Sequence, residues 1–215
     1  MNSFSSLVAG IVPGFWRPIL TNFFPFLAYL VVTTFTPGPN NIMSMSNGLR
    51  YGYKKSFNFL LGIFTGFVVV MLLCGLLNFV LLSLLPQVKF WLTLLGAAYM
   101  IYLAVHIALS KPEEDAPGAS RLNNFKAGFI MQFVNLKVIL YGITIYSSFI
   151  IQSFQSPVVI SLFAPLLAGV GFISCSVWAL GGNLFRSFLR KYFLAFNLAM
   201  AALLVYTAAA SLLAK

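Results

Sequence analysis

A single lysine lies inside an apolar stretch of this chain, where its charge is costly. Lys137 follows Gln132-Phe133-Val134-Asn135-Leu136 within the hydrophobic run 124–152. A lysine in the middle of a membrane costs several kcal/mol, and such residues usually face the protein interior and mark a substrate or ion pathway. We interpret Lys137 in this way. The alternative is a lysine whose long side chain reaches back to the membrane interface.

A second polar segment interrupts the first apolar run. Thr36-Pro37-Gly38-Pro39-Asn40-Asn41 contains two prolines, each of which lacks an N–H group and breaks a helix. In a bilayer, the backbone groups freed by such a break are tolerated only where they are buried in protein or line a wet cavity. Broken helices of this kind commonly form the substrate sites of transporters. The alternative is a proline kink with capping asparagines that serves packing alone.

The composition identifies the elements that must position these residues. The chain has 215 residues, of which 60% are hydrophobic and 7% charged. Soluble domains contain about 25% charged residues, so the sequence predicts an integral membrane protein. The net charge of +10 does not indicate nucleic-acid binding, because the basic residues lie in short clusters between apolar runs, where topology signals belong.

Runs long enough to cross a membrane predict an all-α protein with six transmembrane helices. A span needs about 20 apolar residues. The second run is long enough to require tilt or a frayed end, and its Gly62 and Gly66 predict a close helix contact. The predicted spans are 20–49, 57–85, 89–110, 124–152, 158–182 and 192–213.

The basic residues between the spans predict the orientation. Nine lie in the connections on one side of the membrane and three lie on the other. The excess marks the cytoplasmic face, so both termini are expected outside. Residues 1–18 are expected to form an interfacial extension. The nine are Arg50, Lys54, Lys55, Lys111, Arg121, Lys126, Arg186, Arg190 and Lys191, and the three are Arg17, Lys89 and Lys215.

An internal repeat is indicated by the positions of the polar segments. Thr36–Asn41 and Asn135–Lys137 each lie in the first span of a three-span half. An odd number of spans inverts the second half relative to the first. We therefore expect a single transmembrane domain, 1–215, with repeats at about 20–110 and 124–213 whose polar segments meet near the membrane midplane.

At these residues the chain resembles the lysine-exporter superfamily, also called LysE/RhtB. The family has a Pro-Gly-Pro in its first span, here Pro37-Gly38-Pro39, and an Asn-Pro-Lys in its fourth, here Asn135-Leu136-Lys137. Leu136 stands where the family's Asn-Pro-Lys has its proline, so the resemblance does not imply a hard kink in span four. The stretches around Lys137 and Cys74 are similar to the cysteine/O-acetylserine exporter branch. The resemblance implies export of cysteine, O-acetylserine or a closely related small neutral amino acid from a bacterial cytoplasm across the inner membrane.

Such a substrate carries a carboxylate and an ammonium. Lys137 would pair with the carboxylate, and the half-helix starting near Asn40 would also favour an anion. No run contains Asp or Glu, so the ammonium would need backbone and amide oxygens. Tyr141 and Thr144 share a helical face with Lys137 and line the same cavity or make interhelical hydrogen bonds. The candidate binding residues are Lys137, Asn135, Asn40, Asn41, Pro37, Gly38, Pro39, Gln132, Tyr141 and Thr144.

The sequence also leads to hypotheses about how transport is driven and about two alternative functions. We expect proton antiport by alternating access, with Lys137 and His106 as candidates for proton coupling. A membrane thiol-disulfide electron carrier would instead use Cys74 and Cys175, for which small apolar packing is the simpler interpretation. A passive amino-acid channel is the other alternative. We expect a transporter rather than an enzyme, with no cofactor, no metal and no nucleic acid, and a homo-oligomer is left open.

Overall fold

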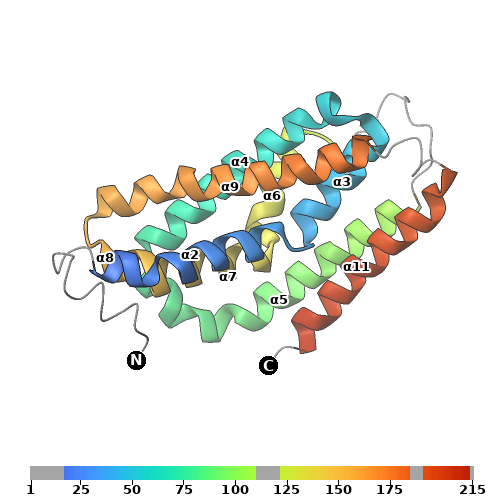
Figure 1. The fold of residues 1–215 in the computed structure, drawn as a ribbon. Helices are drawn as coiled ribbons and strands as arrows, with labels where there is room; N and C mark the ends of the chain where they lie inside the picture. The colour runs from blue at the N-terminus through green and yellow to red at the C-terminus, as the bar shows by residue number, and fades with distance from the viewer. Residues whose placement is uncertain (1–16, 110–121, 185–190, 214–215) are drawn as a thin grey trace.

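The computed structural model describes residues 17–109, 122–184 and 191–213, and these ranges are helical apart from short connections. The breaks divide the first and fourth predicted spans into several pieces (Figure 1). The elements are α2 Arg17–Phe35, α3 Pro39–Tyr51, α4 Tyr53–Leu76, α5 Asn78–Ala108, α6 Phe125–Val134, α7 Leu136–Ile145, the π-helix η1 Tyr146–Ile150, α8 Ile151–Ser153, α9 Pro157–Leu184 and α11 Phe193–Leu213.

The helices form a central group and a flanking pair. α9 packs against α3 and α4, α4 also packs against α6, and α5 packs against α11. The ends of α3, α5 and α9 and the starts of α4, α6 and α11 lie at one end of the bundle (Figure 1). We call this end the basic end, because Arg50, Lys54, Lys55, Lys126 and Lys191 lie at or next to these helix ends. The start of α2 and the connection from α8 to α9 lie at the opposite end, which we call the far end.

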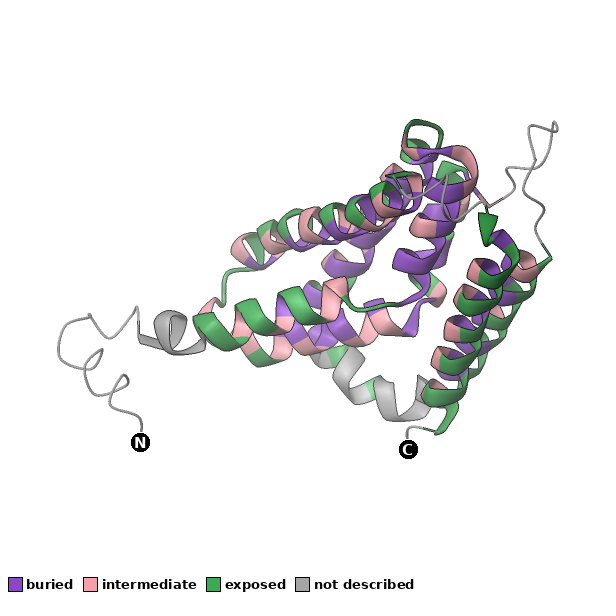
Figure 2. Cartoon of the chain, turned by 45° about the vertical axis from the view of Figure 1, so that its right-hand side comes forward, coloured by how far each residue is buried: buried purple, intermediate pink, exposed green. Residues whose placement is uncertain are grey.

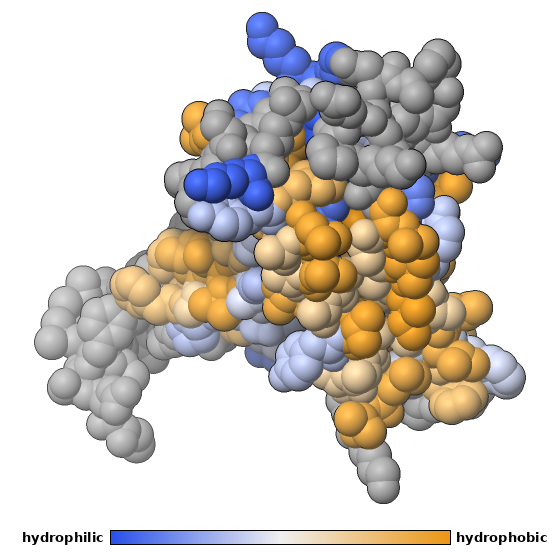
Figure 3. Space-filling model, turned by 90° about the vertical axis from the view of Figure 1, so that its right-hand side faces the viewer, coloured by the Kyte–Doolittle hydropathy of each residue, from blue (hydrophilic) through white to orange (hydrophobic). Residues whose placement is uncertain are grey.

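The outer surface of the bundle is apolar. Exposed faces of the helices alternate with buried faces that point inward (Figure 2), and large side chains such as Phe24, Leu166 and Leu184 are more than half exposed. Hydrophobic side chains cover the middle of one face, with hydrophilic ones gathered along its upper edge (Figure 3). Within the described ranges, five helical segments are long and apolar enough to cross a membrane, and two shorter apolar helices accompany them. The prediction of an all-helical integral membrane protein is confirmed, and the six-span count stays a prediction.

The predicted boundary between spans two and three is wrong. The helix of span two ends at Leu76, and residues 78–85 belong to α5 instead. The chain turns at Leu77, next to the buried Asn78, whose amide nitrogen donates to the Ile143 carbonyl at 3.2 Å. Hydropathy does not reveal this turn, because the residues on both sides of it are equally apolar. The expected interfacial extension, residues 1–18, lies almost wholly outside the described residues.

Glycines allow two pairs of helices to touch through their backbones near the basic end. A Cβ atom at Gly48 would overlap the Ala179 carbonyl oxygen, and one at Gly182 would overlap the Met45 carbonyl oxygen, so α3 and α9 approach reciprocally. α4 and α6 approach in the same way, with Gly62 and Gly66 against the Phe125 and Phe129 carbonyls and Gly128 against the Phe59 carbonyl. The close contact predicted from Gly62 and Gly66 is confirmed.

Candidate functional site

The first break separates α2 from α3, and side chains donate hydrogen bonds to the carbonyls that the break leaves free. α2 ends at Phe35, and Gly38, in an extended conformation, precedes α3 with Pro39 in the first helical position. The Asn41 amide nitrogen donates to the carbonyls of Thr34 and Thr36, both at 2.9 Å. The Thr34 carbonyl also accepts from the Ser174 hydroxyl at 3.0 Å. Asn41 therefore holds the end of α2 against the start of α3.

The second break lies at Asn135 and needs no proline. This residue has φ −85° and ψ 93°, which ends α6 and begins α7. Its carbonyl accepts the N–H groups of Val138 and Ile139 at 2.9 and 3.1 Å, and its amide nitrogen donates to Asn40 Oδ1 at 3.0 Å. The helix break in span four is thus present in this chain although the residue after Asn135 is leucine.

This geometry predicts that Leu136→Pro is tolerated. Leu136 is the first residue of α7, where an N–H group lacks an intrahelical partner and proline is favoured. Asn135 already has the extended conformation that a following proline requires. We expect Leu136→Pro to keep the melting temperature in detergent close to that of the wild type. Leu140→Pro, within α7, is the control and should cost about 3 kcal/mol or more. Equal losses for both variants would contradict the assigned break.

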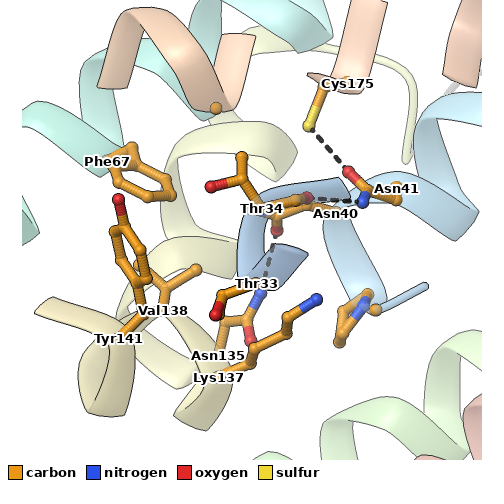
Figure 4. Close-up of a pocket in the computed structure, with 13 residues that line it drawn as sticks. Thr33, Thr34, Asn40, Asn41, Phe67, Asn135, Lys137, Val138, Tyr141 and Cys175 are labelled. Carbon is orange, nitrogen blue, oxygen red and sulfur yellow. Dashed lines mark hydrogen bonds between the residues drawn. The ribbon is translucent and has the colours of Figure 1, made fainter. Parts of the chain in front are cut away.

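The two breaks contact each other directly (Figure 4). Lys137 Nζ donates to the carbonyl and the hydroxyl oxygen of Thr36, at 2.8 and 3.0 Å. The lysine side chain passes close to Gly38, where a Cβ atom would lie 3.0 Å from Lys137 Cδ and 3.2 Å from Nζ. Beside this contact, Asn40 exchanges hydrogen bonds with Gln132, at 2.8 and 3.2 Å. Polar residues more than 90 positions apart in the sequence thus form one cluster.

A cavity of about 40 Å³ opens where the breaks meet. Seven of the ten candidate binding residues line it, namely Gly38, Pro39, Asn40, Asn41, Asn135, Lys137 and Tyr141. Three do not: Pro37, Thr144 and Gln132, of which Gln132 is fully buried and bonded to Asn40 and the Gly128 carbonyl. The remaining lining residues, which the sequence did not single out as ligands, are Thr33, Thr34, Phe67, Val138, Gly171 and Cys175.

Comparison with known proteins identifies the family. The LysE type translocator family matches residues 31–215. The chain belongs to this family. Proteins named cysteine/O-acetylserine efflux protein are 40% identical: one from Klebsiella pneumoniae over 183 residues (85% of this chain, 93% of the relative), one from Shigella flexneri over 191 (89% and 96%) and one from Escherichia coli K12 over 183 (85% and 93%). No solved structure matches the chain significantly.

The two cysteines of this LysE type translocator have different surroundings. Cys175 lines the cavity, and its thiol donates to Asn41 Oδ1 at 3.4 Å. Cys74 lies outside the lining and packs against Gly142, with its thiol 3.9 Å from the Ile139 carbonyl. Both are free thiols. His106 also lies away from the cavity, at the end of α5 beside the Tyr102 ring.

The cavity of this translocator combines a cation with hydrogen-bonding groups and an apolar wall. α3 and α7 both begin beside it, and the start of a helix favours an anion. The Tyr141 hydroxyl is buried beside Thr34 and forms no hydrogen bond of normal geometry within the described structure, whereas buried polar groups normally have one. Phe67, Val138 and Gly171 supply the apolar part of the lining. The arrangement suits a small molecule with an anionic group and a short side chain.

Proposed function

We propose that this chain exports a small neutral amino acid, cysteine and/or O-acetylserine, from a bacterial cytoplasm across the inner membrane by alternating access. The names of its relatives support this substrate class. The observation that carries the proposal is Lys137, a cation beside a polar cavity at the meeting of two helix breaks, with no carboxylate among the lining residues.

The substrate carboxylate would take the place of Thr36 at Lys137. In the structure the lysine ammonium donates to two oxygens of Thr36, both neutral. A carboxylate is a stronger acceptor for a charged donor, and the starts of α3 and α7 add to its stabilisation. Binding would therefore release the contact between Lys137 and the end of α2, which links substrate occupancy to the relative position of the two breaks.

The substrate ammonium and side chain would use the rest of the cavity. Asn135 Oδ1 accepts no hydrogen bond from the described residues, and with the Thr33 hydroxyl it can accept from an ammonium. Asn40 Oδ1, by contrast, already accepts from Gln132 and Asn135. A short thiol or acetyl side chain would lie on the apolar wall, and the Tyr141 hydroxyl would donate to a substrate oxygen. The absence of an acidic lining residue disfavours lysine or arginine as substrate.

Orientation and coupling belong to the same proposal. We assign the basic end to the cytoplasm, because basic residues concentrate there, and both termini to the outside. The halves 20–110 and 124–213 would form inverted repeats within one transmembrane domain. Transport would be driven by proton antiport, with Lys137 and His106 as the candidates for proton coupling.

Counterflow in proteoliposomes tests the proposed function. Vesicles preloaded with unlabelled cysteine or O-acetylserine, kept reduced, should accumulate the same labelled amino acid above the level in protein-free liposomes. Labelled lysine should not accumulate. A pH step without preloaded substrate should then drive accumulation against the gradient, which a passive channel does not achieve. Absence of counterflow for every neutral amino acid tested would overturn the proposal.

A further inference from the structure

We propose that Tyr29 is a gate residue: its ring, stacked on Tyr141, closes the cavity toward the far end and positions the Tyr141 hydroxyl. The two rings are 5.9 Å apart between centroids and inclined by 5°. Tyr29 does not line the cavity, so it would act through Tyr141 and not as a substrate ligand. Its role in transport rests on the proposed function, whereas its role as a barrier does not.

The direction of the chain places the stack on one side of the cavity. α2 runs from the far end toward the first break, so Tyr29 lies one helical turn beyond the lining residue Thr33 in the far-end direction. α7 runs the opposite way, so Tyr141 lies one turn beyond Lys137 in that same direction. The stack therefore stands between the Lys137 ammonium and the far end.

Further aromatic rings extend this barrier. Phe149, on the π-helix η1, lies 5.9 Å from Tyr29 and 5.8 Å from Phe26 between ring centroids. Phe67 of α4 contacts Tyr141 edge to face at 5.9 Å. Rings from four helical segments, α2, α4, α7 and η1, thus meet around Tyr29 and Tyr141. Each aromatic pair is individually a weak contact, so these contacts can break and reform.

The other side of the cavity is closed in a different way. Toward the basic end, α3 packs against α9 and α4 against α6, with glycines of one helix in contact with backbone carbonyls of the other. Only a movement of whole helices can open these contacts. Toward the far end, glycines meet side chains instead: Gly142 faces Met71 and Cys74, and Gly75 faces the Tyr146 ring. Side chains can rotate without helix movement. Removing one ring should therefore open the far side alone.

Labelling of Cys175 measures this barrier without requiring transport. In a Cys74→Ala background Cys175 is the only thiol of the chain, and it lines the cavity. The rate of its reaction with a charged, membrane-impermeant methanethiosulfonate is measured from each side of oriented vesicles. The basic side is identified in a separate sample by a cysteine placed at the exposed Lys54, with Cys175→Ser.

We expect Tyr29→Ala to raise the labelling rate at least tenfold from the far side and to leave the basic side unchanged. Tyr29→Phe, which keeps the stacking ring, should label as slowly as the parent. Phe24→Ala, which removes a mostly exposed ring from the same helix, is the matched control and should have no effect. Tyr29→Leu, which keeps apolar bulk without a ring, replaces Tyr29→Ala if that variant does not purify as a monodisperse species.

An unchanged far-side rate in Tyr29→Ala or Tyr29→Leu would overturn the proposal. So would an equal increase from both sides, which indicates general loosening, or an equal increase in Tyr29→Phe. If labelling becomes faster on the far side while no amino acid exchanges in the counterflow assay, the barrier stands and the proposed function fails. If exchange occurs and labelling does not change, the function stands and Tyr29 is not the gate.

Discussion

Lys137→Ala should reduce counterflow of the preferred amino acid at least about 100-fold, which corresponds to about 2.7 kcal/mol of lost stabilisation. The variant removes the cation of the cavity and both hydrogen bonds to Thr36. A hydrogen bond to a charged group contributes about 1.5–3 kcal/mol, so a loss of this size is expected when the lysine no longer donates to a bound carboxylate. Initial rates of labelled substrate uptake into preloaded proteoliposomes measure the effect.

Lys126→Ala is the matched control for this prediction. Lys126 lies at the edge of the fourth predicted span, where it is exposed at the start of α6 and outside the cavity lining. Its removal should leave counterflow within about twofold, because exposed charges contribute little. If Lys137→Ala exchanges as well as the wild type, Lys137 is an interfacial anchor, and the substrate site must be sought among the residues of the first break.

Two further variants separate substrate binding from proton coupling. Lys137→Arg keeps a positive charge but cannot release a proton under assay conditions. His106→Ala removes the single histidine of the chain. If Lys137→Arg and His106→Ala both retain full pH-driven transport, neither residue carries the coupled proton. Loss of pH-driven transport with preserved counterflow in either variant would support coupling at that residue.

The first helix break could be predicted from the sequence, whereas the second could be predicted only in part. Pro37 and Pro39 break a helix by their own covalent structure, so the end of α2 and the start of α3 follow from local chemistry. The break at Asn135 depends on tertiary contacts, above all its hydrogen bond to Asn40. Leu136 in place of the family proline therefore gives no local indication of a break that the fold nevertheless contains.

Polar residues within apolar runs predicted much of the cavity lining. The sequence alone did not show which of these residues face the cavity and which do not. Lys137 and Asn135 were identifiable because a membrane makes such side chains costly. Cys175 and Phe67 look like ordinary packing residues, and only the approach of α9 and α4 to the first break shows that they line the cavity. Gln132 shows the converse: it is polar and central, yet its hydrogen bonds point into the helix contacts behind the cavity.

Alanine substitution at the adjacent glycines Gly181 and Gly182 of α9 should affect the melting temperature differently, with a decrease expected at Gly182 alone. A Cβ atom at Gly182 would overlap the Met45 carbonyl oxygen and lie 2.9 Å from the Leu49 nitrogen, both backbone atoms of α3 that cannot rotate away. Gly182→Ala must therefore push α3 and α9 apart, at a cost of about 1–3 kcal/mol. We expect a melting temperature in detergent that is lower by several degrees, followed by intrinsic fluorescence or by loss of the monodisperse peak.

Gly181→Ala is the control one residue earlier in the same helix. A Cβ atom there would meet nothing within 4 Å, and alanine replaces glycine in a helix with a gain of about 0.5–1 kcal/mol. Its melting temperature should be unchanged or slightly higher, and Gly169→Ala, which also faces open space, should behave alike. A destabilised Gly181→Ala would mean that another surface covers this face of α9. A stable Gly182→Ala would mean that α3 and α9 do not touch through their backbones, and the closure assigned to the basic end would then be wrong.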